Sequence, residues 1–470
     1  MIRSTEQRAF SGSTGTAVVF FVCCIICLNV FATFNLPGRK HMQPGDLDLA
    51  GIIKVLVRAV SVAALGWIVF AHLKIGDVRK ITARHSAWLL FTAWAITTTA
   101  WSPLKSFTLG QSGGQAVLAM LSICVAMSVM HFRIYLFITL LSTTFYCLVY
   151  GVGSLVLPDM IDIGRSSVDA VIHPTALGAA SSLGLLIVFG IWLTSETRWL
   201  RISAWLLVPV LVVSLLAAHN RLSILLTVLV GTAMFVSKGR SHLLAAFSVV
   251  TCLFTLTYVL VDPGLVHVEA VSGTGAEFLQ RGQSTNQLTQ LSGRAEMWTA
   301  MWKSYLDAPI LGHGYFVSSR TGRILVWHVE MNHTAHNVWL QGLVSTGLIG
   351  TLALFAWCLN VARMQFSIWL GGWSASSSRP FNRIPETSLL PVAVMFWFFA
   401  WTMLNASILG PLRPESVVFA VSTGTIAGRF HLTTLANKAA VHAAAAHRIN
   451  ANRINANRIK TEQSVSEGAE

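Results

Sequence analysis

Two arginines and a histidine, far apart in the chain, carry side chains that could bind an anion and activate a hydroxyl group. Arg221 stands at the start of one apolar stretch, Arg294 follows Ser292 in a polar segment, and His336 precedes Asn337 at the start of another apolar stretch. A guanidinium group binds a pyrophosphate through paired hydrogen bonds, and a neutral imidazole accepts a proton from a hydroxyl group. Nearby arginines would also disfavour the imidazolium form. This set fits attack of a hydroxyl on a carbon that carries pyrophosphate, a leaving group that needs no general acid.

Each of these residues also has an ordinary structural explanation. An arginine at a helix end commonly extends to lipid phosphate, an arginine in a loop is usually solvated, and a histidine at a helix start is often an interfacial polar residue. Their occurrence together on one face of the protein is what favours a site.

We expect no metal, redox centre or cofactor. Cys24 and Cys27 have the spacing of a redox or metal pair, but apolar residues surround them. Asp46 and Asp48 have the spacing of a metal-dependent nucleotide-sugar site, yet the predicted topology places them outside, away from cytosolic nucleotide sugars. His313 has no second ligand nearby, and the glycines on either side of it predict a tight turn.

The composition is that of an integral membrane protein. Of the 470 residues, 54% are hydrophobic and 11% are charged, whereas a soluble domain carries roughly 25% charged residues. The net charge of +14 comes from residues scattered in short loops and one tail, a pattern of membrane topology rather than of nucleic-acid binding. All seven cysteines fall in apolar stretches, so no disulfide framework is implied.

The predicted fold class is all-α, a polytopic helical bundle of about twelve transmembrane helices. The first apolar stretch is too long for a signal-peptide core and lacks a clear cleavage site, so it is interpreted as a span. The predicted spans lie near 17–34, 51–72, 86–101, 113–131, 134–156, 174–194, 202–219, 222–237, 242–261, 336–362, 388–406 and 415–429.

The distribution of the 33 Lys and Arg residues predicts the orientation, because the larger share falls in loops and termini on one side of the membrane. This places the N-terminus (1–16) and the tail (430–470) in the cytoplasm, with helices 1–9 in 17–261 and helices 10–12 in 336–429. The long loop 262–335 is then periplasmic, and its length favours an ordered lid with a function. The stretch from 295 to 305 in this loop is amphipathic and predicts a helix.

The tail contains an alanine run and two copies of Arg-Ile-Asn-Ala-Asn. It is interpreted as a solvated, partly disordered cytoplasmic segment, with weak contact to anionic lipids as the alternative.

Two spaced motifs in the long loop and the following span carry a family resemblance. His336-Asn337 is followed after nine residues by Gly347-Leu348-Ile349-Gly350, and upstream lie Ser292-Gly293-Arg294 with Trp298, then Pro309-Ile310-Leu311-Gly312-His313-Gly314. Together they resemble the signature of the O-antigen ligase and polysaccharide polymerase superfamily.

Further upstream the resemblance is looser and points to exopolysaccharide polymerases. Trp101-Ser102-Pro103 resembles a family Trp-Ser motif, and the segment from His173 to Gly178, after Gly164-Arg165, is similar to a pattern of those polymerases. Two positions differ from the family, which usually has Ser at the position of Asn220 and often Asn at that of Thr175.

The resemblance implies roles for the candidate residues. His336 would activate the acceptor hydroxyl, while Arg221 and Arg294 would hold the undecaprenyl pyrophosphate of the donor. Such enzymes are metal-independent inner-membrane proteins with an architecture similar to that of other membrane glycosyltransferases, the GT-C class. The remaining binding candidates are Asn337 and Ser292, and the secondary candidates are His173, His313 and Trp298. His173 is also explained as a structural residue at the start of the sixth span.

The function expected from this resemblance is polymerisation of undecaprenyl-pyrophosphate-linked oligosaccharide repeat units into exopolysaccharide or O-antigen at the periplasmic face. Its partners would be the lipid-linked donor, a glycan acceptor and a chain-length regulator or export complex. The alternative is an O-antigen ligase that transfers the glycan to lipid A-core, since both reactions would use the same residues. A flippase of lipid-linked sugars fits less well, because the sequence shows neither repeated halves nor ionisable residues near the midplane.

Overall fold

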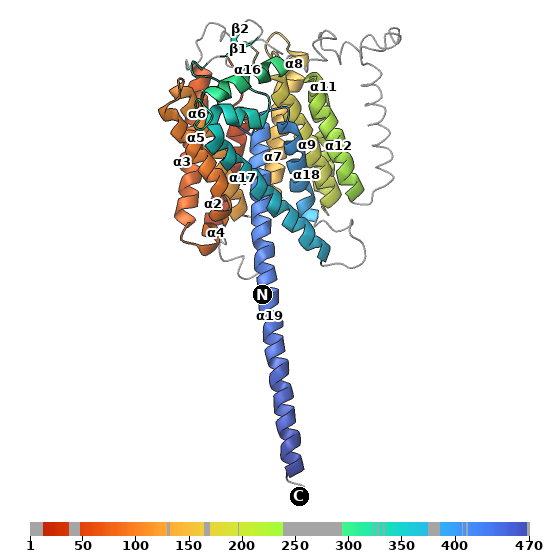
Figure 1. The fold of residues 1–470 in the computed structure, drawn as a ribbon. Coiled ribbons are helices and arrows are strands. Elements are labelled where there is room, and N and C mark those ends of the chain that lie inside the picture. Colours follow the sequence, from red (N-terminus) through yellow and green to blue (C-terminus); the bar gives the residue numbers. More distant parts are fainter. Residues whose placement is uncertain are drawn as a thin grey trace, which may run out of the picture.

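The computed structural model describes residues 13–36, 48–128, 132–163, 170–195, 197–237, 294–322, 324–326, 329–331, 334–374, 386–406, 408–409 and 412–467. The described part is a bundle of helices with one short hairpin at one end (Figure 1). This confirms the predicted class, a polytopic helical membrane protein, and adds the hairpin to it.

The first half of the chain forms helices that run up and down the bundle. They are α2 (Ser13–Phe31), α3 (Leu49–His72), α4 (Gly76–Arg84), α5 (Ser86–Thr97), η2 (Thr98–Ala100), α6 (Lys105–Met127), α7 (Phe132–Cys147), η4 (Leu148–Val152), α8 (Gly153–Val156), α9 (Pro174–Thr194), α10 (Arg198–Leu206), α11 (Val208–Ala217) and α12 (Arg221–Ser237).

The second half supplies the elements around His336. They are α16 (Arg294–Asp307), the antiparallel strands β1 (Ile324–Val326) and β2 (Val329–Met331), α17 (Val338–Ser374), α18 (Glu386–Thr402) and α19 (Pro414–Glu467). The helix expected within the long loop is confirmed as α16.

Six of the described helical segments are long and apolar enough to cross a membrane. They are Leu49–His72, Lys105–Met127, Ile134–Val156, Pro174–Thr194, Arg198–Ala217 and Val338–Ile368. Shorter apolar helices lie at Gly15–Phe31, Arg221–Ser237 and Leu389–Thr402. Every predicted span other than 242–261, which lies outside the described residues, overlaps a helix. The total of about twelve spans stays a prediction.

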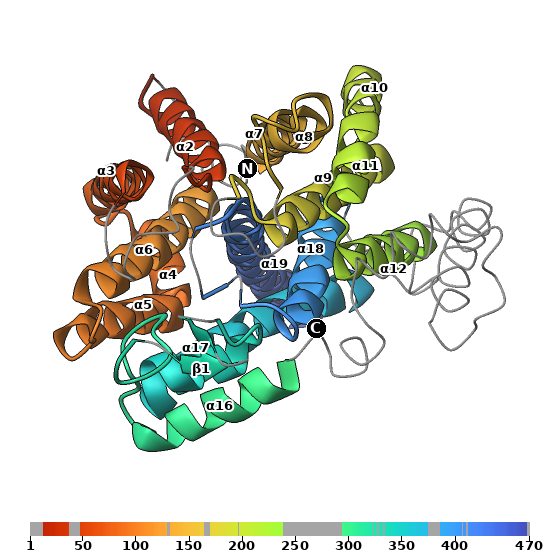
Figure 2. The ribbon, with the colours of Figure 1, turned by 90° about the horizontal axis from the view of Figure 1, so that it is seen from above.

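The bundle is built around α19, which lies at its centre when viewed from above and contacts α6, α17, α18 and α9 (Figure 2). A buried aromatic cluster fixes this arrangement. The rings of Trp88 and Trp357 are stacked with centroids 4.1 Å apart, and Phe419 of α19 packs edge-on against Trp357 at 5.5 Å. Because these residues come from α5, α17 and α19, the cluster holds α17 against the central helix.

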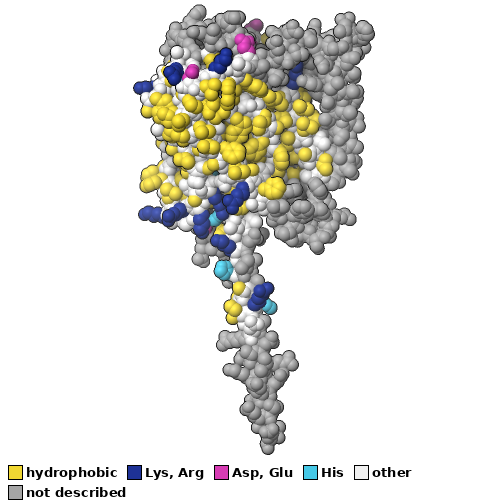
Figure 3. Space-filling view, viewed as in Figure 1, with side chains coloured by type: hydrophobic (Ala, Val, Ile, Leu, Met, Phe, Trp, Pro, Cys, Tyr) yellow, Lys and Arg dark blue, Asp and Glu magenta, His cyan; other side chains and the backbone are white. Residues whose placement is uncertain are grey.

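On the face shown in Figure 3, apolar side chains form a band across the middle of the bundle, with Lys and Arg residues above and below it. Helix α3 contributes Trp67 and Phe70, which are 71% and 70% exposed. Large apolar side chains exposed in a continuous band are the mark of a surface that faces lipid.

Helix α19 continues without a break through the tail to Glu467, so the structure differs from the partly disordered tail that the sequence suggested. The reason is local: the segment 429–467 has no Gly or Pro and is rich in Ala, Arg and other good helix formers. At the base of the bundle this helix is tied to α4, because the Arg84 guanidinium lies 4.7 Å from the Phe430 ring centroid and His431 Nε2 lies 3.3 Å from Asp77 Oδ1.

Candidate active site

His336 lies at the start of α17 between two residues that are fixed by hydrogen bonds. The Ala335 N–H donates to Gln341 Oε1 at 2.7 Å, and the Ala335 carbonyl accepts from the Trp298 indole N–H at 2.7 Å. His336 itself has φ of 47°, a left-handed conformation that is uncommon outside glycine. Such a conformation persists where the surroundings hold it. Trp298, a secondary candidate, therefore helps to position the histidine from α16.

Asn337 is the N-cap of α17. Its Oδ1 accepts from the backbone N–H groups of Trp339 and Leu340 at 2.9 and 3.0 Å, and its Nδ2 donates to the Met403 carbonyl at 3.2 Å. The first contacts satisfy N–H groups that a helix start leaves unpaired. The last ties this corner to the end of α18.

The Gly-x-x-Gly motif marks a break in α17. Gly347 has φ of 64° and ψ of −168°, a backbone conformation adopted almost only by glycine. A helix broken here loses the hydrogen bonds from the Leu348 and Ile349 N–H groups to the Val344 and Ser345 carbonyls. These two N–H groups and two carbonyls therefore need other partners.

The loop that contains Gly312-His313-Gly314 satisfies these four groups. The Leu348 N–H donates to the Pro309 carbonyl at 2.9 Å, and the Ile349 N–H donates to the Ile310 carbonyl at 3.4 Å. In return, the His313 and Gly314 N–H groups donate to the Val344 and Ser345 carbonyls, each at 3.0 Å. The two glycine motifs of the sequence are thus the two sides of one backbone joint, which we call the glycine joint (308–314 with 344–350).

The glycines of the joint are required by space as well as by φ. Gly312 and Gly314 have φ of 71° and 115°, which confirms the predicted tight turn. A Cβ on Gly347 would meet the Ile310 carbonyl oxygen, and a Cβ on Gly314 would lie 2.5 Å from the Ser102 side chain. The Trp-Ser motif supports the joint from the other side, because Trp101 Nε1 donates to the Gly312 carbonyl at 3.1 Å.

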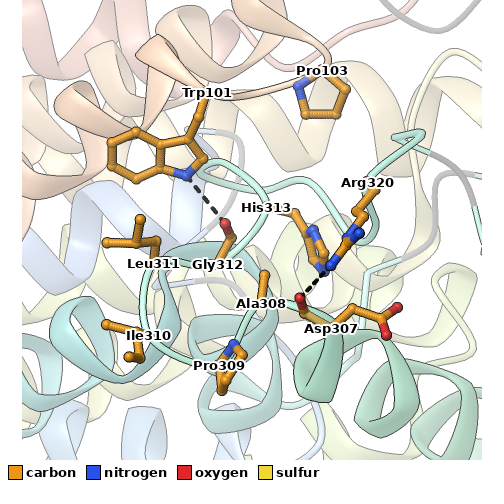
Figure 4. A pocket seen from close by; sticks show the side chains of 10 residues that line it. All are labelled: Trp101, Pro103, Asp307, Ala308, Pro309, Ile310, Leu311, Gly312, His313 and Arg320. Atoms are coloured by element: carbon orange, nitrogen blue, oxygen red, sulfur yellow. Dashed lines mark hydrogen bonds between the residues drawn. The ribbon is translucent and has the colours of Figure 1, made fainter.

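His313 is buried at the joint and has a structural contact set. Its Nε2 lies 2.8 Å from the Ser304 carbonyl oxygen and 3.2 Å from Ser304 Oγ, which connects the joint to α16. Burial lowers the pKa of His313 below its ordinary value of 6.5. The adjoining pocket of about 490 Å³ is shown in Figure 4, where Arg320 Nη2 donates to the Asp307 carbonyl at 2.8 Å.

Arg221 is the first residue of α12, and the side chain of the preceding residue, Asn220, caps this helix. Asn220 Oδ1 accepts from the Ser223 N–H at 3.2 Å, which is the capping hydrogen bond. Asn220 packs against Gly178 of α9, where a Cβ would lie 2.6 Å from the Asn220 Cβ. Arg221 Nε and Nη2 are buried and have no hydrogen-bond partner within the described part of the chain. Such donors suit an anionic ligand.

His219, which the sequence motifs did not predict as a candidate, resembles His336 in its local structure. Both histidines have φ of 47°, both follow a buried alanine, and both precede an asparagine that caps a helix. The signal was present, because Ala-His-Asn occurs at 218–220 and again at 335–337.

The remaining candidates are His173, Ser292 and Arg294. His173 caps α9, with its Nδ1 accepting from the Thr175 N–H at 3.2 Å, a structural contact at the start of that helix. Ser292 lies outside the described residues, and Arg294 is described only as the first backbone position of α16.

The structure brings the starts of α12 and α17 to the end of the bundle that carries α16 and the hairpin (Figure 1). Both helices contact α18, and the carbonyl of Met403, directly after α18, accepts from Asn337 Nδ2. Arg221, His336 and the first residue of α16 therefore lie at one end of the bundle, as the predicted topology requires of a shared site.

One comparison with known proteins identifies a domain around these residues. The family model described as O-Antigen ligase matches residues 167–355, a range that contains Arg221, Arg294, His336 and the glycine joint. No curated protein matches the chain. Residues 167–355 therefore carry an O-antigen ligase domain, which supports the resemblance of this part of the chain to the O-antigen ligase and polysaccharide polymerase superfamily.

Proposed function

We propose that the protein is a membrane glycosyltransferase that polymerises undecaprenyl-pyrophosphate-linked oligosaccharide repeat units into a surface polysaccharide. The observation that carries this proposal is that His336 and Arg221 stand at the starts of two helices at the same end of the bundle, within the O-antigen ligase domain. A membrane protein of this family acts on a lipid-linked oligosaccharide and a glycan acceptor.

In the proposed reaction, a hydroxyl oxygen of the acceptor attacks the anomeric carbon of the donor sugar. His336 accepts the hydroxyl proton as the new glycosidic bond forms. The bond between the anomeric carbon and the pyrophosphate oxygen breaks, and undecaprenyl pyrophosphate leaves with its negative charge held by Arg221 and Arg294. The arginines supply the positive charge that a metal ion provides in other glycosyltransferases, so the proposed reaction is metal-independent.

The second candidate is the ligase reaction, in which the finished glycan moves to lipid A-core. It is favoured by the description of the matching family, O-Antigen ligase. The segment from His173 to Gly178, similar to exopolysaccharide polymerases, favours polymerisation. Its Gly178 packs on Asn220 beside Arg221, so the segment bears directly on the proposed donor site.

We propose that the site faces the periplasm and that both chain termini are cytoplasmic. The α4 end of the bundle supports this orientation, because Lys74, Arg79, Lys80 and Arg84 gather there beside the basic part of α19. Clusters of Lys and Arg mark the cytoplasmic side of membrane proteins. The α16 end is then periplasmic.

The test is complementation of a strain that lacks the gene with wild type, His336→Ala, Arg221→Ala or Arg294→Ala. Loss of polymerase activity leaves single repeat units on the surface and removes the ladder. Full-length polymer stranded on undecaprenyl pyrophosphate assigns the ligase reaction instead. Normal polymer in all three variants refutes the site. His442→Ala and Arg448→Ala, both exposed on the tail helix, are the matched controls and should complement fully.

A further inference from the structure

A second pocket lies beside the candidate base, between α16 and the start of α17. It is lined by Trp298, Thr299 and Trp302 of α16 and by Asn337 and Leu340 of α17, and its volume is about 490 Å³. Asn337 directly follows His336 in the chain. A ligand in this pocket would therefore lie next to the residue proposed to accept the proton.

The lining contains two indoles, a hydroxyl and an amide, and none of its described residues is charged. This composition is unsuited to a pyrophosphate, which requires cationic donors. It is suited to an uncharged ligand that has both apolar faces and hydroxyl groups. A sugar ring is such a ligand, because its C–H faces pack on aromatic rings and its hydroxyls form hydrogen bonds.

The two tryptophans are placed differently. The Trp298 indole N–H is bound to the Ala335 carbonyl, so its ring has a fixed direction. Trp302 is 50% exposed, and its ring centroid lies 5.2 Å from that of Tyr305 on the same helix. Trp302 thus presents an open aromatic face at the rim of the pocket, backed by a second aromatic ring.

We propose that this pocket holds the terminal sugar of the acceptor glycan and directs its hydroxyl toward His336. Trp302 packs on the ring face, and Thr299 lies beside its hydroxyls. Asn337, whose Oδ1 caps α17 and whose Nδ2 donates to the Met403 carbonyl, has one Nδ2 hydrogen left to donate to them. This inference rests on the proposed function and deepens it, because it separates an uncharged acceptor site on α16 from the cationic donor site at Arg221.

The alternative role for Trp302 is that of an aromatic anchor at the membrane interface, where tryptophans are enriched. An anchor needs no pocket and no neighbour at the reacting group. The fixed ring of Trp298 and the amide of Asn337 within the same pocket favour a bound saccharide.

The test is binding to the purified full-length protein in nanodiscs, measured by titration calorimetry with two probes. The first probe is the repeat-unit oligosaccharide released from the host polysaccharide without its lipid pyrophosphate, and the second is undecaprenyl pyrophosphate. Trp302→Ala should weaken oligosaccharide binding by about tenfold, Trp302→Phe should restore most of it, and undecaprenyl pyrophosphate binding should be unchanged in both. Arg221→Ala should show the opposite pattern.

Trp199→Ala is the matched control, because Trp199 is 62% exposed on α10 and lines neither pocket. Wild-type oligosaccharide affinity in Trp302→Ala overturns the acceptor pocket while leaving the proposed function standing, provided that His336→Ala still fails to complement. An equal loss for both probes, matched by Trp199→Ala, identifies an interface anchor and also overturns it. Full complementation by His336→Ala would instead refute the proposed function.

Discussion

At the scale of single residues, the asparagine that caps α12 leads to a first expectation. Asn220 precedes Arg221, and its side chain caps the helix that begins with Arg221. Ser and Asn are comparable N-caps, whereas Ala at this position costs about 1 kcal/mol. We expect Asn220→Ser to keep both stability and activity.

Asn220→Ala should unfold at a lower temperature and complement less well, since Arg221 loses its fixed helix start. Thermal unfolding of the purified variants together with the complementation ladder measures both effects. Equal melting temperatures for the Ser and Ala variants would contradict the capping role.

The geometry of Arg221 leads to a second expectation. A lysine retains the positive charge but lacks the planar fork of a guanidinium, so it cannot form two parallel hydrogen bonds to a pyrophosphate. Arg221→Lys should therefore raise the KM for the lipid-linked donor by about tenfold or more and leave the KM for the acceptor unchanged. A donor KM equal to that of wild type would remove Arg221 from the donor site.

His313 gives the glycine joint a dependence on pH. Burial lowers its folded-state pKa, so the folded protein binds fewer protons than the unfolded chain in the range just below the ordinary histidine pKa of 6.5. The stabilisation is complete above 6.5 and is lost as the pH falls through the folded-state value. Melting temperatures measured from pH 8 to pH 5 should fall more steeply for wild type than for His313→Gln. Parallel curves would contradict this assignment.

At the scale of elements, the glycine joint is the feature that positions the base. It fixes α17 at Gly347, and the short first part of that helix then carries His336. Gly347→Ala should destabilise the protein by at least about 2 kcal/mol and abolish complementation, because a Cβ would meet the Ile310 carbonyl oxygen at a strained φ.

Gly113→Ala is the matched control for this substitution, because a Cβ there has nothing within 4 Å and the residue lies inside α6. It should be neutral or slightly stabilising. Thermal unfolding and protein level in the membrane compare the two variants, and similar losses in both would show that the joint has no special role.

The elements also show what the sequence could and could not predict. The helical spans and α16 follow from apolar length and amphipathic spacing, both of which are local properties. The break at Gly347 does not, because a glycine inside an apolar run fits an unbroken helix equally well. Only its pairing with residues 309–314, more than 30 positions earlier, reveals the break. The motifs predicted the candidate residues, and the caps at Asn220 and Asn337 are local, but the contacts of Ala335 with Trp298 and of Asn337 with Met403 are tertiary and could not be predicted from the sequence.

At the scale of the whole molecule, the orientation in the membrane is the property that determines which substrates the site meets. Thr321 is exposed at the α16 end, and Lys438 is exposed on α19 beyond the opposite end. In spheroplasts, a membrane-impermeant maleimide should label Thr321→Cys, whereas Lys438→Cys should react only after the membrane is disrupted. The parent protein measures the background from the native cysteines. The reverse labelling pattern would place the site in the cytoplasm.

The segment between Gly314 and Ala335 is attached to α17 at both ends. The Gly314 N–H donates to the Ser345 carbonyl in the glycine joint, and the Ala335 N–H donates to Gln341 Oε1. Its two attachment points lie within one turn of the same helix, and Tyr315, Phe316 and Val317 directly after the joint are buried in the core. The hairpin of β1 and β2 therefore lies between fixed ends, and changes confined to the hairpin should leave the residue proposed to accept the proton in place. For protein engineers, the hairpin is the natural position at which to graft loops that alter the choice of glycan.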